Sequence, residues 1–540
     1  MSHNLGVVFL TQAQSVGVFA DLAVRLTHGG EAARTAFYVA DSGSFNRFAS
    51  ERADFVTTAD IVKEWEILQR AQQMSPTLER IAELEKCYGE SLWNAVIADR
   101  RLSMGRNAVR EQDYVPRYSR EELLSILIAV ADELEALFDR VRPDMVVGFI
   151  CVTVGEYLAH LIARARGIPM INLRPTRIRN FFYGGEDVFE PSASLEVVYR
   201  NFMESGMPDA ARAAAGQILA AVRESHAMYE GVLPARGQSV AVSQVGNDTK
   251  PAPTRETASA RLGRIARETW DYNFGALSAD NHRTHRLAAH WFRRVKKPCR
   301  AILIRSALGR NYIDDLEGLG REGYAFFPLH KEPEITLLVY GRPWRNQIEA
   351  VRTIARALPA GITLLVKEHP AAIGYRPLSY YRKLLAIPGV KLVSPHRTSR
   401  EVLSHARLVT IIGGSVGLEA LMLKLPVVAL GNVPFPFLPD NMICASRDPD
   451  SLGEDVAALL SGHRHDESAL EAYVAAVTES SVAIDFYSVL LGRGGGIYRP
   501  DGPNSASYDA QLERLADYVM QRYRLFATPD DSLLPLASVQ

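Results

Sequence analysis

Cysteine is scarce in this chain and forms no cluster. The 540 residues include four cysteines, which lie far apart, at Cys87, Cys151, Cys299 and Cys444. No two of them have the short spacing that metal sites use, so a metal site built on cysteine is not expected. Isolated cysteines of this kind predict small buried side chains in a protein of a reducing compartment.

Long apolar runs and an excess of one charge are also absent. No stretch approaches the ~20 apolar residues that a membrane-spanning helix needs. The opening residues, MSHNLGVVFLTQAQS, have neither the cationic region nor the long apolar run of a signal peptide. Lysine plus arginine (61) nearly balance aspartate plus glutamate (62), so an extended nucleic-acid surface is not expected. These features predict a cytoplasmic protein, with peripheral contact at the inner membrane left open.

A strand–helix–strand pattern in the first half indicates a parallel sheet. The apolar run MVVGFI is followed by the helical pattern VTVGEYLAHLIARARG and a second run, IPMINL, with Gly167 placed to end the helix. Strands are also expected at residues 6–10 and 35–40. A unit of this kind builds a parallel sheet, because its two strands run in the same direction.

The second half, from Tyr324 onward, alternates strand-like and helical patterns. Apolar runs typical of buried strands begin at residues 324, 335, 362, 390, 408 and 426, and read YAFFPL, ITLLVY, ITLLVK, VKLV, LVTII and PVVAL. This alternation predicts a second doubly wound domain. Residues 237–260 are rich in small and polar residues and lack apolar periodicity, as in a linker or exposed loop.

The sequence therefore predicts an α/β fold with two doubly wound, Rossmann-like domains that face a central cleft. The expected bounds are 1–235 for the N-terminal domain, 236–320 for a linker and interdomain helical segment, 321–470 for the C-terminal domain and 471–540 for a helical tail. Ligands of such folds bind beyond the carboxyl ends of the strands. Polar residues that directly follow strands are therefore the candidates for a site.

One strand of the second half ends on residues suited to a phosphate. The segment ITLLVKEHP closes with Lys367, Glu368, His369 and Pro370. An imidazole there can donate a hydrogen bond to a phosphate oxygen or act on a leaving group, and the proline fixes the backbone that aims it. The alternative is that His369 only caps a loop.

Another strand ends in a glycine pair that opens a helix. In LVTIIGGSVGLEAL, Gly413 and Gly414 permit a close approach of the backbone, and Ser415 stands at the helix N-terminus, where free N–H groups attract anions. Glu419 follows one turn later and could accept hydrogen bonds from ribose hydroxyls. The alternative is an ordinary helix capped by Ser415. Together, the two strand ends predict a nucleotide mono- or diphosphate site.

Two further segments permit two interpretations each. His330 and Glu334 lie in the polar stretch HKEPE, and Gln347 begins a helix; these residues line the predicted cleft or belong to a surface loop. The segment 291–300, WFRRVKKPCR, concentrates basic residues beside two aromatic ones. It is a solvated helix face, or a patch that contacts anionic lipid or an acidic glycan.

The order of these segments resembles the capsule polysaccharide biosynthesis family, which includes the β-Kdo transferases of bacterial capsule and lipopolysaccharide assembly. The resemblance rests on FFPLHKEPE, Gln347, LLVKEHP, GGSVGLEAL and KLPVVALG, and more weakly on RPDMVVGF, the VGE turn and INLRPTR. It implies a glycosyltransferase of GT-B architecture that uses a CMP-activated sugar, held at its cytidine monophosphate by His369, Pro370 and Ser415. Polymerases of teichoic-acid type, which use CDP-glycerol, carry a similar His-Pro and Ser pair, so cytidine is implied more directly than the sugar.

The resemblance also implies that catalysis comes from the N-terminal domain. Retaining β-Kdo transferases are thought to use a glutamate as acid/base and an aspartate as nucleophile. Glu156, directly after the MVVGFI strand, is the candidate for the first; the alternative is that it only complements its helix dipole. Asp187 is the candidate for the second, with little to separate it from Asp144 or Asp314. Arg174 and Arg177 are candidates for pairing with the sugar carboxylate.

No cofactor is expected, and no metal, because no DxD arrangement follows the predicted strands and a single phosphate has less need of a bridging ion. The expected partners are a nucleotide sugar and a glycan acceptor, without nucleic acid. A CDP-glycerol-type glycerophosphotransferase and a non-catalytic nucleotide-binding protein of the same fold remain the alternatives.

Overall fold

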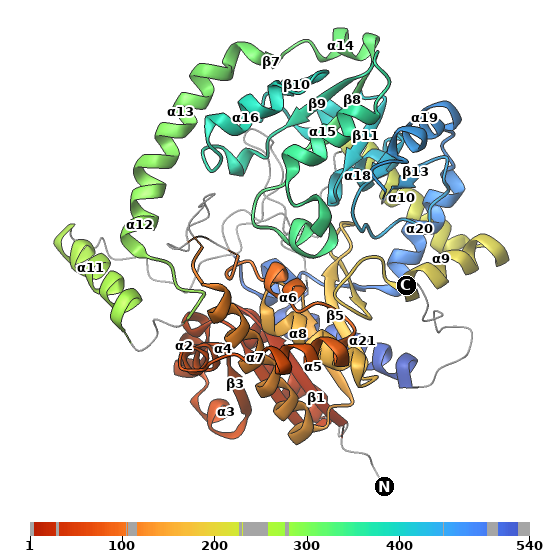
Figure 1. The fold of residues 1–540 in the computed structure, drawn as a ribbon. Helices are drawn as coiled ribbons and strands as arrows, with labels where there is room; N and C mark the ends of the chain where they lie inside the picture. Colours follow the sequence, from red (N-terminus) through yellow and green to blue (C-terminus); the bar gives the residue numbers. More distant parts are fainter. Residues whose placement is uncertain are drawn as a thin grey trace.

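Two α/β domains make up the protein, each with helices on both faces of a seven-stranded sheet (Figure 1). The computed structural model describes residues 5–28, 32–103, 105, 116–225, 229, 258–275, 280–446, 448–493 and 506–527. The two sheets confirm the predicted fold class, a pair of doubly wound, Rossmann-like domains as in GT-B architecture. Residues 237–257 of the predicted linker lie outside the described residues.

The N-terminal sheet has the strand order β14-β6-β5-β4-β1-β2-β3. Its strands are β1 (Leu5–Thr11), β2 (Ala32–Val39), β3 (Asp60–Lys63), β4 (Met145–Phe149), β5 (Met170–Pro175), β6 (Phe181–Gly185) and β14 (Val482–Ala483). The strands from β5 to β3 pair in parallel, whereas β6 and β14 are antiparallel additions at one edge. The strand order changes direction at β1 and β4, which places a switch point between their carboxyl ends.

The helices of the N-terminal domain cover this sheet, and the predicted strand–helix–strand unit is confirmed as β4, α8 and β5. They are α1 (Ser15–His28), α2 (Ser42–Glu51), α3 (Ala53–Thr58), α4 (Glu64–Ala71), α5 (Leu78–Tyr88), α6 (Trp93–Ala98), α7 (Arg120–Val141) and α8 (Val154–Ala165). Gly167, predicted to end α8, adopts a positive φ of 65° just beyond it.

The C-terminal sheet has the order β13-β12-β11-β8-β9-β10-β7, and all its strands pair in parallel. Its strands are β7 (Tyr312–Ile313), β8 (Tyr324–Pro328), β9 (Thr363–Lys367), β10 (Val390–Val393), β11 (Leu408–Ile411), β12 (Val427–Ala429) and β13 (Ile443–Ala445). The helices that follow β7 are α14 (Leu316–Glu322), α15 (Gln347–Ala357), α16 (Leu378–Leu385), α17 (Ser399–Leu403), α18 (Ser415–Met422), α19 (Leu452–Gly462) and α20 (Glu467–Ser480). The switch point of this sheet lies between β8 and β11.

One predicted strand of the C-terminal domain is wrong. The run ITLLVY forms a π-helical turn, η3 (Thr336–Tyr340). Ile335, Leu338 and Val339 are buried in the same apolar cluster as residues of the N-terminal sheet and of α7 and α8. The run is apolar because it packs against the other domain, a reason that strand-like composition does not reveal.

The chain crosses between the domains more than once. Helices α9 (Ala193–Ser205) and α10 (Asp209–Ser225) leave the N-terminal sheet and pack with α18 and α20 in the core of the C-terminal domain. After α20 the chain returns, and α21 (Tyr508–Ala527) covers one face of the N-terminal sheet. The predicted helical tail is thus divided: its first residues lie in α20 of the C-terminal core, and α21 packs in the core of the first domain.

The prediction of buried cysteines holds only for Cys151, since Cys87 and Cys299 are exposed and Cys444 is half-buried. Spacing along the sequence carries no information on which side of a helix a cysteine occupies. Among the described residues, no helix combines the length and the apolar composition that crossing a bilayer requires.

Candidate active site

Three strand ends of the C-terminal domain meet at its switch point. Strand β8 lies between β9 and β11, so the loops after these strands are neighbours. They carry His330, His369 and the Gly414–Ser415 pair. These residues come from segments up to 85 positions apart (330 to 415), and the topology of the sheet brings them to one edge.

The turn into α18 leaves a helix N-terminus without a side-chain cap. Gly414 has a φ of 95°, a region that residues with a Cβ rarely adopt. A Cβ built on Gly414 would lie 3.2 Å from Cε1 of His330, so the imidazole rests directly on this turn. Because no side chain accepts hydrogen bonds from the first N–H groups of α18, they are suited to an anion.

His330 contributes a buried nitrogen to this edge. Its Nδ1 lies 3.3 Å from a carboxylate oxygen of Glu334. Its Nε2 is buried and has no hydrogen-bond partner within the protein. Buried polar atoms normally have partners, so this one is a strong candidate to meet a ligand.

His369 presents a defined tautomer to the same edge. Its Nδ1 accepts a hydrogen bond from the backbone N–H of Ala371 (3.1 Å), so in the neutral ring the proton is on Nε2. The ring is exposed at its outer edge, yet the loop beneath it removes enough water to lower the pKa of His369, and Lys367 adds to this effect. The neutral imidazole is therefore an Nε2 donor.

Glu368 is occupied by structural contacts. It is buried and accepts hydrogen bonds from Arg376 (2.5 Å) and from the Tyr381 hydroxyl (2.8 Å). Arg376 also donates to the backbone oxygen of His330 (2.5 Å), so one guanidinium ties the loops after β8 and β9 together.

Gln347 strengthens the same connection. Its side chain accepts from the His330 N–H (2.7 Å) and donates to the His330 oxygen (3.1 Å). It thus holds the backbone on both sides of the imidazole.

Lys367 and Glu419, from the two segments that were predicted to bind a phosphate, influence each other's pKa. Burial lowers the pKa of Lys367, an effect that Glu368 and Glu419 oppose. Burial raises the pKa of Glu419, and the positive charges of Arg400 and Lys367 reduce this rise. The ends of β9 and β11 thus lie within electrostatic reach of each other.

The N-terminal domain reaches this edge through Arg177. Burial alone would raise the pKa of Glu334, but the hydrogen bond with His330 and the charges of Arg177 and His369 lower it. Arg177 adopts a positive φ of 69°, and its guanidinium lies 5.4 Å from the ring centre of Tyr229. Strained backbone of this kind is concentrated at functional sites.

Arg174, in contrast, is fully buried, at a place where the N-terminal domain meets Tyr340 of the C-terminal one. It is only 1% exposed, with Glu190 at 3.8 Å and the ring centre of Tyr183 at 5.0 Å. An added Cβ at Gly185 would collide with its guanidinium, so this side chain lies directly against β6. Both arginines lie within electrostatic reach of Tyr340 in the C-terminal domain, and Arg177 also lies within reach of Glu334.

Glu156 is built into the N-terminus of α8. It is 1% exposed, and its Oε2 accepts from the backbone N–H groups of Val152 (2.7 Å) and Thr153 (3.0 Å) in a capping box. Its Oε1 has one side-chain partner, the amide of Gln12 (3.2 Å). Burial raises the pKa of Glu156 to about 8, so the carboxyl holds a proton at neutral pH.

The three aspartates occupy different places. Burial raises the pKa of Asp187 to about 6, against the opposing charge of Arg174. Asp144 accepts from the Gly6 N–H (2.6 Å) at the amino ends of β1 and β4, the edge opposite to Glu156. Asp314 follows the edge strand β7 of the other domain. Asp187 is therefore the best placed of the three.

Gln12 was not among the residues that the sequence predicted. Its amide nitrogen donates to the backbone oxygens of Phe149 (3.1 Å) and Ile150 (2.8 Å) as well as to Glu156, and so bridges the switch point of the N-terminal sheet. A polar residue directly after the first strand was the available signal.

A cavity of about 400 Å³ lies between the two domains. Asn94 and Phe189 line it from the N-terminal domain, and Arg342 and Asn432 from the C-terminal one. Arg342 also donates to the Tyr157 hydroxyl (2.8 Å), so this side chain links the domains. The volume suits a small-molecule ligand.

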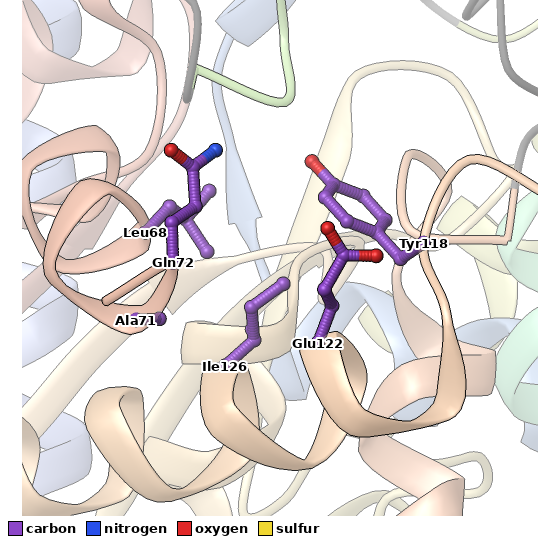
Figure 2. Close-up of a pocket in the computed structure, with 6 residues that line it drawn as sticks. All are labelled: Leu68, Ala71, Gln72, Tyr118, Glu122 and Ile126. Atoms are coloured by element: carbon purple, nitrogen blue, oxygen red, sulfur yellow. The ribbon is translucent and has the colours of Figure 1, made fainter. Parts of the chain in front are cut away.

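Another pocket is too small for a substrate. Figure 2 shows it between Gln72 on one side and Tyr118 and Glu122 on the other. Its volume of about 10 Å³ is that of a single water position. Among the described residues, no group of three or more His, Cys, Asp or Glu side chains is arranged to hold a metal ion.

Comparison with known proteins finds one matching family model and several similar solved structures. Residues 340–438 match the family described as "Capsule polysaccharide biosynthesis protein", which confirms the resemblance over this part of the C-terminal domain. No curated protein matches the chain. Similar solved structures include a UDP-GlcNAc 2-epimerase of Neisseria meningitidis, at 10% identity over 95% of this chain and 99% of that one, with a TM-score of 0.28. Two others belong to Thermosulfurimonas dismutans KpsC: a β-Kdo 2,7 transferase (10% identity, 72% and 89% covered, TM-score 0.34) and a β-Kdo 2,4 transferase (13%, 62% and 79%, 0.31).

Proposed function

We propose that this protein is a glycosyltransferase that moves a Kdo-like or other nonulosonate sugar from a CMP-activated donor to a capsule or lipopolysaccharide glycan of a bacterial surface. The main support for the proposal is that His330, His369 and the uncapped N-terminus of α18 lie together at one switch point. The match of residues 340–438 to the capsule family supports it, since two of these three features lie within the matched range.

The donor phosphate is proposed to lie at this edge. The Nε2 donor of His369, Ser415 and the first N–H groups of α18 bind its oxygens, and the unpartnered Nε2 of His330 faces the same group. Glu419 accepts from the ribose. Glu368, Gln347 and Arg376 hold the loops in place, and Arg177 pairs with the carboxylate of the sugar.

Glu156 and Asp187 of the N-terminal domain have different proton affinities, which gives them different roles in the proposed reaction. With pKa values of about 8 and about 6, Glu156 is protonated and Asp187 ionised at pH 7. The bond from the anomeric carbon to the phosphate oxygen breaks, its electron pair leaves with CMP, and Glu156 supplies a proton. Asp187 attacks the anomeric carbon, and an acceptor hydroxyl then displaces it and returns its proton to Glu156.

Binding of CMP tests the nucleotide. At 100 times its dissociation constant, CMP should stabilise the protein by about 2.7 kcal/mol, measured as a shift of the thermal unfolding midpoint, while UDP and GDP should have no effect. Stabilisation by UDP or GDP but not CMP would refute a cytidine site. Product formation from CDP-glycerol and none from CMP-Kdo would assign the protein to glycerol phosphate transfer instead, and CMP binding without either product would leave a nucleotide-binding protein.

Replacement of His369 tests the donor edge. His369→Ala should weaken CMP binding by about 10- to 100-fold, because a hydrogen bond to a charged group is lost. Isothermal titration gives the dissociation constant. His396→Ala is the matched control, since His396 follows the neighbouring strand β10 and is exposed. Equal affinity in both variants would place the phosphate elsewhere.

A further inference from the structure

A helical arm lies along one side of the molecule, outside both sheets (Figure 1). It consists of α11 (Ala258–Phe274) and a longer helix formed by α12 (Arg286–Trp291), the π-helical turn η1 (Phe292–Lys296) and α13 (Lys297–Leu308). The predicted basic segment 291–300 is the middle of this longer helix.

The arm exposes an unusual amount of apolar surface. In the described part of the chain, 13 large apolar side chains are exposed, and eight of them belong to the arm: Leu262, Trp270, Phe274, Leu287, Trp291, Val295, Ile302 and Leu303. Trp291 is 62% and Ile302 70% exposed. Since α11 packs against α12, these side chains are gathered in one part of the molecule, and such a gathering marks an interaction surface, whereas single exposed residues do not.

These side chains follow the helical repeat. Leu287, Trp291 and Val295 follow one another at intervals of four residues, and Ile302 follows Val295 after seven, which places these four side chains on one side of the long helix. Phe292, Ile304 and Leu308 of the same helix are buried. The long helix therefore has one apolar face toward the protein and another toward the outside.

The charge of the long helix has a single sign. Between Asn281 and Ile313 the sequence has nine Lys and Arg residues and no Asp or Glu, in a chain whose net charge is -1. The nine are Arg283, Arg286, Arg293, Arg294, Lys296, Lys297, Arg300, Arg305 and Arg310. Such an apolar face flanked by cations is typical of helices that lie in a membrane interface.

The inner side of the arm is fixed to the donor-binding domain. The ring of Phe292 lies 5.4 Å from that of Tyr375, and the ammonium of Lys297 lies 4.1 Å from the same ring. Arg300 donates to the Tyr375 backbone oxygen (3.1 Å). Tyr375 belongs to the loop that begins at His369 and Pro370, so the arm has a fixed position relative to the candidate donor edge.

We propose that the outer face of this arm binds the surface of a membrane that contains anionic lipids. Cations attract the lipid phosphates, while Trp291, Ile302 and Leu303 enter the boundary between head groups and acyl chains. A second copy of the chain is a poorer occupant, because a two-fold interface places the same basic surface on both sides. An acidic glycan would satisfy the cations but leave the apolar side chains in water.

Vesicle sedimentation tests the proposal with the full chain. The protein should sediment with vesicles of phosphatidylcholine containing phosphatidylglycerol, and at least about tenfold less with phosphatidylcholine alone, since each cation near an anionic surface contributes about 1 kcal/mol. Arg293→Glu/Arg294→Glu and Trp291→Ser/Ile302→Ser should each reduce binding at least about tenfold. The matched controls are Arg382→Glu/Lys383→Glu and Leu78→Ser, which change exposed residues outside the arm and should bind normally.

Each contrary result overturns the proposal in a distinct way. Absence of binding to anionic vesicles rejects a membrane surface. A second contrary result is binding to a soluble polyanion without binding to vesicles. If Arg293→Glu/Arg294→Glu abolishes this binding and Trp291→Ser/Ile302→Ser leaves it unchanged, the arm binds an acidic glycan. Loss of a dimer in Trp291→Ser/Ile302→Ser, again without vesicle binding, assigns it to a second copy. The assay contains no nucleotide sugar, so its outcome is independent of the proposed transfer activity.

Discussion

Glu156→Gln is expected to reduce the rate of sugar transfer by about two to four orders of magnitude, the usual contribution of a positioned acid or base. Glutamine occupies the same volume and can still accept the hydrogen bonds of the Val152 and Thr153 backbone, so the start of α8 should stay intact. The variant loses only the proton that the buried carboxyl holds at neutral pH. Initial rates with CMP-Kdo, together with circular dichroism, measure the two effects.

Glu122→Gln is the matched control for this substitution. Glu122 completes the capping box of α7 with Ser119 in the same domain, but it is exposed. The Glu122→Gln variant should transfer sugar at the normal rate. If both variants are fully active, Glu156 has a capping role only, and the acid lies elsewhere.

The pH dependence gives an independent view of the same group. The rate should fall as pH rises through about 8, where Glu156 loses its proton, and as pH falls through about 6, where Asp187 gains one. The pKa of Glu156 is higher in the folded than in the unfolded state, so its protonated form contributes to the stability of the protein. This contribution is fully present below the unfolded pKa of ~4.3 and is lost as pH rises through about 8. Urea unfolding at pH 5 and pH 8 should therefore show Glu156→Gln gaining stability relative to the natural protein at the higher pH.

Arg376→Met is expected to destabilise the protein by about 3–5 kcal/mol, because it leaves the buried carboxylate of Glu368 without its charged partner. It also removes the donor to the His330 backbone oxygen, so the loops after β8 and β9 lose their shared contact. Urea unfolding curves give the change in free energy of unfolding. Arg382→Met, at an exposed position of α16, should stay within about 0.5 kcal/mol of the natural protein.

A companion substitution separates the two consequences of losing Arg376. Replacing both members of the pair, as in Arg376→Met/Glu368→Gln, removes the unpaired charge and should recover part of the lost stability. A double variant no more stable than Arg376→Met would show that the pair contributes through loop packing rather than through charge.

The strand-end rule accounts for most of what the sequence could predict. Polar residues directly after apolar runs made His369, Ser415 and Glu156 candidates, and the structure places each of them just beyond the carboxyl end of a parallel strand. The rule failed for ITLLVY, since a short apolar run has the same composition whether it forms a strand or a helical turn. Length alone did not decide between them.

Contacts between distant segments account for what the sequence could not predict. Glu368 was expected to contact the donor, but its carboxylate accepts a hydrogen bond from Arg376. No local sequence pattern predicts such a pair. Arg174 and Arg177 are three residues apart and equally basic, yet the first is fully buried against β6, whereas the second is half-buried and lies within electrostatic reach of Glu334. The exposed apolar stripe of the arm was hidden for the same reason, because burial on one side of a helix depends on what packs there.

The last segment of the chain belongs to the core of the first domain, and this has a consequence for the order of synthesis. Leu512, Leu515 and Val519 of α21 pack in the same cluster as Val7 and Phe9 of β1. During translation, α1 and α2 can cover part of that face early, but the part that α21 covers stays exposed until α21 has left the ribosome. The C-terminal domain, whose strands end at β13, can assemble earlier. The half of the protein that is made first is therefore the half that is completed last.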